Sequence, residues 1–128
     1  MTRADLQECI EAIEKSYEFF LAYAAQGARD EAASKVGAQL RDFLGQMEGA
    51  LAALRDDLGS IVEAEGLEPA DRYRDMVEIA ASDAGRALAA VRLVAAQDVI
   101  SSELIDNLNA SIHLRVLLTD LFLLDEVV

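Results

Sequence analysis

The side chains that could carry chemistry in this sequence begin with its one histidine, His113. An imidazole can accept a phosphoryl group, exchange a proton or bind a metal ion. Di-iron sites in helical bundles require Glu-x-x-His pairs, and the residue three positions before His113 is Ala110. One histidine and one cysteine also make haem or structural zinc an unfavourable interpretation. We therefore predict no metal and no cofactor.

Cys9 and the carboxylates do not form a recognisable catalytic set. Cys9 is the one cysteine, so an internal disulfide is excluded. A helical cysteine beside an apolar stripe usually behaves as a small hydrophobic residue rather than as a nucleophile. The 24 acidic residues follow no spacing that would pair two of them as acid and base, and no phosphate-binding glycine loop is present. We predict that the protein is not an enzyme.

The charge of the chain restricts its partners. The 24 acidic and 11 basic residues give a net charge of −13, which argues against binding to nucleic acid or to anionic membranes. No uncharged apolar run approaches the ~18 residues of a membrane-spanning helix, and the segment after Met1 lacks the apolar run of a signal peptide. We expect a cytoplasmic protein that binds neither nucleic acid nor membranes.

The elements that must position these side chains are helices. The chain contains one proline in 128 residues, and alanine, leucine and glutamate are abundant, which favours helix throughout a single domain. Thr2 is a suitable N-cap, and Gly27 and Gly66 are suitable C-terminal ends. Similar lengths and short links predict an all-α, up-down-up-down four-helix bundle. The predicted domain is 1–128, with helices at about 2–25, 30–58 or 30–65, 69–97 and 101–126.

The last predicted helix has two apolar faces. One broad stripe is the expected core face, and it contains Leu104, Ile105, Leu108, Ile112, Val116 and Leu123. A second face contains Leu114, Leu117, Leu118 and Leu121. One interpretation is that this helix is wedged between its neighbours and buried all round. The other, which we adopt, is that the second face meets another chain, with Arg115 beside it as a specificity element.

These observations predict a non-enzymatic protein-interaction module, an acidic adaptor, scaffold or chaperone-like protein that forms a homodimer through its C-terminal helix. An alternative is a phosphotransfer or signalling module that uses His113. Its resemblance to histidine phosphotransfer modules is one of architecture, because those modules usually have Lys-Gly after the histidine and this chain has Leu114 and Arg115. A third possibility is a small apolar ligand in the bundle core.

Overall fold

The computed structural model describes residues 1–34 and 36–128, and none of them forms a β-strand. The predicted all-α class is confirmed. In chain order the elements are α1 (Arg3–Ala25), the 3-10 helix η1 (Glu31–Ala33), α2 (Gly37–Asp57), the 3-10 helix η2 (Leu58–Ser60), α3 (Ile61–Ala64), α4 (Ala70–Ala95), α5 (Ser102–Ala110) and α6 (His113–Val127).

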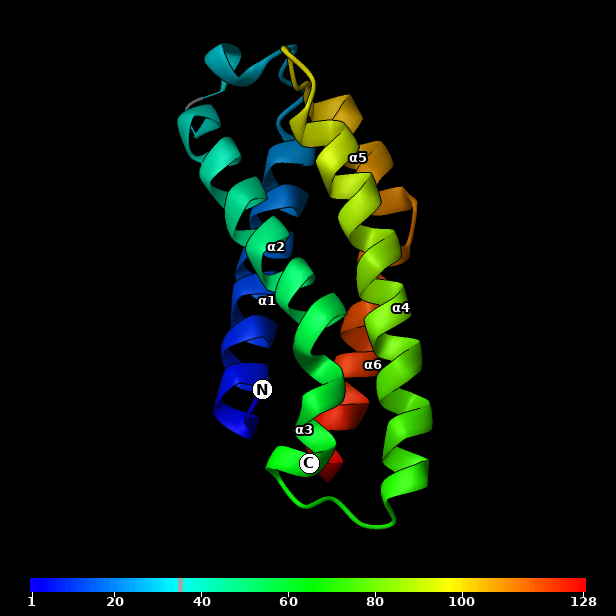
Figure 1. Cartoon of the computed structure of the whole chain (residues 1–128). Helices are drawn as coiled ribbons and strands as arrows, with labels where there is room; N and C mark the ends of the chain where they lie inside the picture. The colour runs from blue at the N-terminus through cyan, green and yellow to red at the C-terminus, as the bar shows by residue number, and fades with distance from the viewer. Residues whose placement is uncertain (35) are drawn as a thin grey trace.

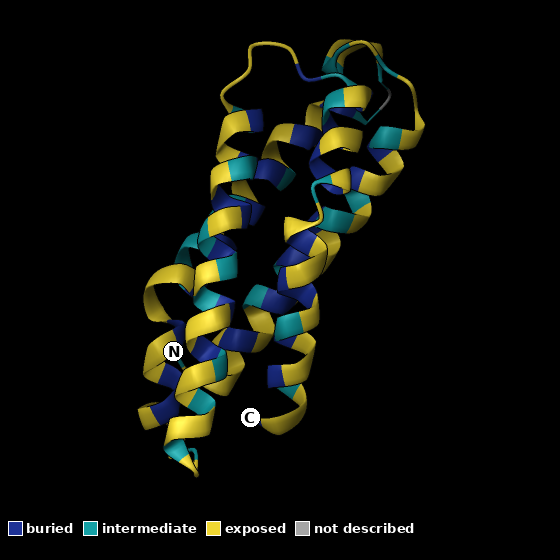
Figure 2. Cartoon of the chain, turned by 90° about the vertical axis from the view of Figure 1, so that its right-hand side faces the viewer, coloured by how far each residue is buried: buried dark blue, intermediate teal, exposed yellow. Residues whose placement is uncertain are grey.

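Four rods lie side by side and alternate in direction along the chain: α1, then α2 with α3, then α4, then α5 with α6 (Figure 1). α1 packs against α2, α2 against α4, and α4 against α6, while α5 and α6 both pack against α1. The buried side chains face inward between these rods, and the exposed ones cover the outside (Figure 2). The predicted count of four continuous helices is not met, because α5 and α6 are separate helices and α3 follows α2 as a short extension.

The ends of α1 follow the sequence prediction. The side chain of Thr2 accepts a hydrogen bond from the Asp5 amide, and the Asp5 carboxylate accepts one from the Thr2 amide at 2.8 Å. This reciprocal capping box satisfies two amides that the first turn leaves without helical partners. Gly27, at φ +66°, takes the left-handed conformation that ends a helix. The terminal amine of Met1 then donates to Ser60 Oγ at 2.6 Å, which fastens the start of α1 to the segment between α2 and α3.

The second helix begins later than predicted. Residues 31–33 form η1 instead, capped by the Asp30 side chain, which accepts a hydrogen bond from the Ala33 amide at 2.9 Å. α2 begins at Gly37, where a Cβ atom would lie 1.7 Å from the backbone oxygen of Glu31. Only glycine fits this close approach. Because η1 occupies residues 31–33 and α2 begins at Gly37, the predicted start near residue 30 is wrong. Residue 35, which the predicted helix included, lies outside the described residues.

The far end of this rod agrees with the later of the two predicted ends. η2 and α3 continue the helical path from α2 as far as Ala64. Gly66, at φ +58°, then turns the chain, and α4 begins at Ala70 directly after Pro69. Proline has no amide hydrogen to lose at the start of a helix, which explains why the boundary was visible in the sequence.

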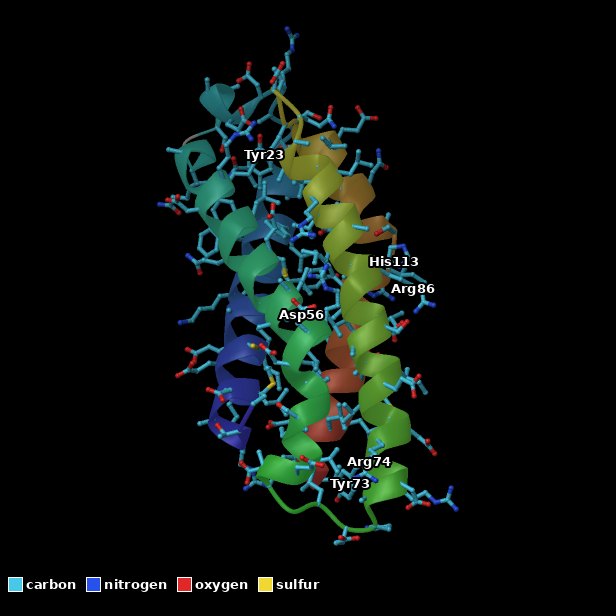
Figure 3. All side chains as sticks on the ribbon, in the orientation of Figure 1. Tyr23, Asp56, Tyr73, Arg74, Arg86 and His113 are labelled. Atoms are coloured by element: carbon cyan, nitrogen blue, oxygen red, sulfur yellow. The ribbon has the colours of Figure 1, made fainter. Side chains whose placement is uncertain are left out.

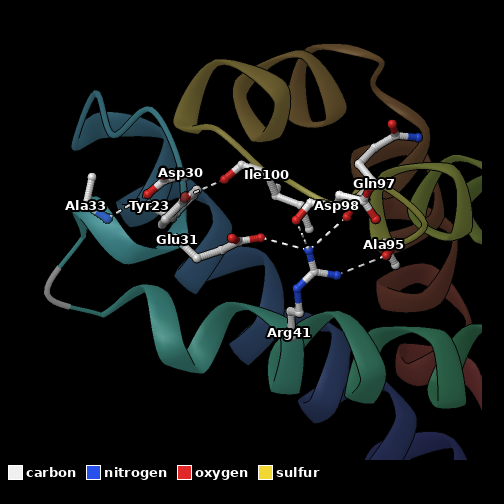
Figure 4. Close-up of polar contacts among 9 residues, drawn as sticks. All are labelled: Tyr23, Asp30, Glu31, Ala33, Arg41, Ala95, Gln97, Asp98 and Ile100. Carbon is white, nitrogen blue, oxygen red and sulfur yellow. Dashed lines mark hydrogen bonds and ion pairs between the residues drawn. The ribbon is translucent and has the colours of Figure 1, made fainter.

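Arg41 joins the start of α2 to the end of α4 (Figure 4). Its guanidinium donates to the backbone oxygens of Ala95 at 3.1 Å, Gln97 at 2.8 Å and Asp98 at 3.2 Å. It also forms an ion pair with Glu31 at 2.9 Å. The last carbonyls of a helix have no partners within the helix, so the bond to Ala95 satisfies one at the end of α4. The bonds to Gln97 and Asp98 hold the link that follows α4.

At the same end of the bundle, Tyr23 and Ser102 set the level of α5 against α1. The Tyr23 hydroxyl donates to the backbone oxygen of Ile100 at 2.6 Å, and the Ser102 hydroxyl donates to the backbone oxygen of Tyr23 at 2.6 Å. The Tyr23 side chain is fully buried. Both hydroxyls are therefore satisfied inside the core, as buried polar groups must be.

The fourth rod is broken, and the predicted single helix over 101–126 is wrong. α5 ends at Ala110, and Ile112 adopts a left-handed conformation at φ +62°. The Ser111 hydroxyl donates to the Leu108 backbone oxygen at 2.6 Å and completes the last turn. A β-branched residue in this conformation is strained by about 1–3 kcal/mol. The turn at Ile112 places the leucines of α6 in the core. Their burial offsets the strain.

Candidate interaction surface on α4 and α6

The predicted interface leucines lie in the core of the single chain. Their side chains are between 0 and 7% exposed, and they are Leu114, Leu117, Leu118 and Leu121. The prediction that they form an outward face for a second chain is therefore wrong. The break at Ile112 rotates α6 relative to the path of a continuous helix, so the face expected to point outward packs against α4 and α1 instead.

The same rotation exposes residues that were predicted to be buried. Because two residues along a helix correspond to a turn of about 200°, burying Leu121 places Leu123 outside. Ile112, Val116 and Leu123 were expected in the core stripe, and they are 51, 40 and 56% exposed. Val127, 50% exposed, continues their line. We call Val116, Leu123 and Val127, together with Ile112 at the N-cap of the helix, the outer stripe of α6.

The apolar surface continues from α6 onto α4. A surface groove of about 350 Å³ separates the C-terminal part of α6 from the N-terminal part of α4. The Tyr73 hydroxyl donates to the Val127 backbone oxygen at 2.9 Å and joins the two helices at this point. Further along α4, Ile79 and Leu93 are exposed. The groove is lined by Arg72, Tyr73, Met76, Leu123, Leu124 and Val127.

Two carboxyl groups meet between α4 and α6, beside the outer stripe. Asp120 of α6 faces Asp83 of α4, and Asp83 forms an ion pair with Arg86 at 2.9 Å. Asp120 Oδ2 is shielded from solvent and has no hydrogen-bond partner among residues 1–34 and 36–128. Burial and the neighbouring Asp83 raise the pKa of Asp120 to about 7. A proton held by Asp120 can be donated to Asp83, which supplies the missing hydrogen bond.

This carboxyl pair was not visible in the sequence. Asp83 and Asp120 lie on different helices, and each resembles the many acidic residues of an exposed helical face. Only the packing of α4 against α6 brings them together. The chemistry that the pair supports is proton uptake near neutral pH, which would change the charge beside the outer stripe.

The other candidate residues lie at the surface or are unreactive. His113 is exposed as the first residue of α6, at a similar level of the bundle to Arg86 of α4 (Figure 3). Arg115 is also exposed, whereas the leucines beside which it was predicted to act as a specificity element are buried. Cys9 is half-buried, and its burial, followed by the charges of Asp5 and Glu8, raises the pKa of its thiol. A raised thiol pKa disfavours the nucleophilic thiolate.

Asn109 and Ser16 form a second unusual feature, inside the bundle. Ser102 bonds to Tyr23 between the antiparallel helices α5 and α1. Ser16 lies seven residues before Tyr23 on α1, and Asn109 lies seven residues after Ser102 on α5. Seven residues are about two turns, or ~10.5 Å, so Asn109 and Ser16 lie at the same level on the facing sides of the two helices. Both are more than nine-tenths buried, and neither side chain has a hydrogen-bond partner within the described part of the chain.

Replacing Asn109 by leucine is expected to raise the free energy of unfolding by about 1–2 kcal/mol. The reason is that a buried amide without partners carries a desolvation penalty, which an apolar side chain of similar size removes. Asn107→Leu, an exposed change on the same helix, should stay within about 0.5 kcal/mol of wild type. Urea unfolding monitored by circular dichroism measures both values. A clear loss of stability in Asn109→Leu would show that the amide has favourable contacts in solution.

Comparisons with protein-family models, with curated proteins and with solved structures found no match to this chain. Among residues 1–34 and 36–128, no three His, Cys, Asp or Glu side chains are grouped as metal ligands would be. No helix in the same ranges is both long enough and apolar enough to cross a membrane. The geometry of the α4–α6 surface is therefore the basis on which a function can be argued.

Proposed function

We propose that the chain is a non-enzymatic protein-interaction module that self-associates through the outer stripe of α6 and the adjoining groove on α4. The observation that carries the proposal is the concentration of exposed large apolar side chains on this surface. Four of them form the outer stripe, and the groove beside Leu123 and Val127 adds Tyr73 and Met76 of α4. Contiguous apolar surface of this kind marks interaction sites, whereas scattered apolar residues do not.

The energetics favour covering this surface. Full burial of a valine, leucine or isoleucine side chain contributes about 1.5–3 kcal/mol. The four residues of the outer stripe are 40 to 56% exposed, so about half of that contribution is still available from each of them. The sum is roughly 3–6 kcal/mol for one chain and roughly 6–12 kcal/mol for the two copies of a pair, which is comparable with the cost of bringing two chains together. Burial of the apolar groove beside α4 adds to this sum.

The position of the groove and the exposure of His113 bear on the two alternative functions. A small apolar ligand would find its apolar hollow in the groove between Met76 and Leu123 at the surface, rather than among the helices of the core. A phosphotransfer role for His113 is supported by the exposure of its side chain at the start of α6. Neither alternative accounts for the outer stripe, so self-association remains our proposal.

Replacing Leu123 by aspartate is expected to convert a dimer of the wild-type chain into a monomer. A carboxylate within an apolar contact loses its water on association without gaining a partner of opposite charge. Light scattering coupled to size exclusion measures the molar mass across the micromolar range. The matched control is Leu21→Asp on α1, because Leu21 is similarly exposed at 49% but lies outside the α4–α6 surface.

Two results would contradict the proposal. One is a monomeric wild-type chain throughout the micromolar range, since the outer stripe would then remain in water without a partner copy. The other is a dimer that Leu21→Asp disrupts as strongly as Leu123→Asp does. That result would place the contact on α1 instead.

A further inference from the structure

The segment from Asp106 to Ile112, which is the second half of α5 and the turn after it, adds little to the core. Within these described residues, Leu108 is the one apolar side chain that is buried. The helix that follows buries four leucines within residues 114–121, and they are Leu114, Leu117, Leu118 and Leu121. Because apolar burial is the main source of stability for a packed helix, residues 106–112 are held much less firmly than α6.

Two unfavourable features lie in or beside the same segment. The side chain of Asn109 is 7% exposed, and neither of its polar atoms has a hydrogen-bond partner in the described part of the chain. The same holds for the hydroxyl of Ser16, which lies at this level on α1. Ile112 holds a left-handed conformation that strains a β-branched residue. Opening of the segment gives water to the polar atoms and releases the strain, so both features favour an open form.

The chain is held firmly on both sides of this segment. Before it, the Ser102 amide donates to the Ala28 backbone oxygen at 2.9 Å, and the Ala28 amide donates to Ser102 Oγ at 2.9 Å. The Ser102 hydroxyl also donates to the backbone oxygen of Tyr23. After the segment, Leu114 is buried in the core. An opening can therefore begin and end between Ser102 and Leu114 without the loss of the other helices.

We infer that residues 106–112 form a gate in the bundle, which opens away from α1 by local unfolding while α1, α2, α4 and α6 remain packed. Opening uncovers the surface of α1 around Ser16 and gives the bundle interior a path to solvent that the closed helix blocks. The gate is a property of the single chain. It goes beyond the proposed self-association and does not depend on it.

Native-state hydrogen exchange detects such an opening. In the monomeric wild-type chain, the amides of Leu108, Asn109 and Ala110 are expected to exchange at least about tenfold faster than those of Leu117 and Leu121. Their exchange should also change little at low urea concentration, since a short segment exposes little surface when it opens. Equal rates with the same steep urea dependence would mean that α5 opens only when the whole chain unfolds, and would overturn the inference.

Asn109→Leu decides whether the opening includes the buried amide. The substitution removes the unpartnered polar group from the closed form, so the amides of Leu108 and Ala110 should exchange about tenfold more slowly. Asn107→Leu, at an exposed position of the same helix, is the matched control and should change these rates by less than about twofold. If only the last residues of α5 frayed, Asn109 would stay buried throughout. Asn109→Leu would then leave the rates unchanged, which would overturn the gate.

Ile112→Asn tests whether the strained turn belongs to the gate. Asparagine adopts the left-handed conformation more readily than isoleucine does, so the closed form becomes more favourable and exchange should slow about fivefold. Val99→Asn is the control, because Val99 is similarly exposed and lies in the link before α5 without a positive φ. Unchanged exchange in Ile112→Asn would place the turn outside the opening segment and contradict the inference as stated.

Thiol labelling tests whether the opening uncovers α1. Ser16→Cys in a Cys9→Ser background places a thiol of similar size beneath the gate. Iodoacetamide should modify this thiol in the folded chain without urea, and addition of Asn109→Leu should slow the modification about tenfold, whereas addition of Asn107→Leu should not. A thiol that reacts only at urea concentrations where the chain unfolds would show that the interior stays closed, and the inference would be wrong.

Discussion

Replacing Leu117 by alanine is expected to lower the free energy of unfolding by about 2–5 kcal/mol. Leu117 is fully buried against neighbouring helices, so its truncation removes apolar contacts and leaves a cavity that a packed core closes only in part. Chemical denaturation of the variant and of the wild-type chain, at a concentration where light scattering shows monomers, measures the difference.

Leu123→Ala is the matched control for this experiment. Leu123 lies on the same helix but is 56% exposed, so its loss should change the stability of the monomer by less than about 1 kcal/mol. The comparison decides which side of α6 faces the core. Equal losses in the two variants, or a larger loss at Leu123, would support the continuous helix predicted from the sequence rather than the helix broken at Ile112.

Raising the pH from about 5 to about 8 is expected to lower the free energy of unfolding by about 2 kcal/mol through Asp120. Its pKa is raised from an ordinary value of 3.8 to about 7 in the folded chain. Between these values the folded state holds a proton that the unfolded state releases, so stability falls as the pH rises. A three-unit shift corresponds to at most about 4 kcal/mol, and partial exposure of the carboxyl reduces the effect.

Asp120→Asn is expected to remove most of this pH dependence and to be more stable than wild type at pH 8. The amide stays uncharged and can donate a hydrogen bond to Asp83, as the protonated acid does. Thermal unfolding of both proteins across the pH range measures the effect, with Asp106→Asn at an exposed position as the control. A variant that keeps the wild-type pH dependence would mean that the carboxyl of Asp120 is ionised in the folded chain at neutral pH.

Local sequence signals determined the helical class and several helix ends. The capping box at Thr2, the left-handed glycines at positions 27 and 66, and the start of α4 after Pro69 all depend on side chains close to the boundary itself. The start of α2 did not follow from such signals. It depends on the close approach between Glu31 and Gly37, which appears only when the preceding turn is built.

The candidate surface required the tertiary structure because it depends on the rotation of one helix. The periodicity of the chain correctly gave two apolar faces at its C-terminal end, but periodicity cannot say which of them points inward. That choice was made by the left-handed turn at Ile112, which shifts the helical phase and places Leu117 inside and Leu123 outside. Asp83 and Asp120 likewise became a pair only through packing between helices that are distant in sequence. Composition and local capping thus determined that helices form, and long-range packing decided which side chains remain available to a partner.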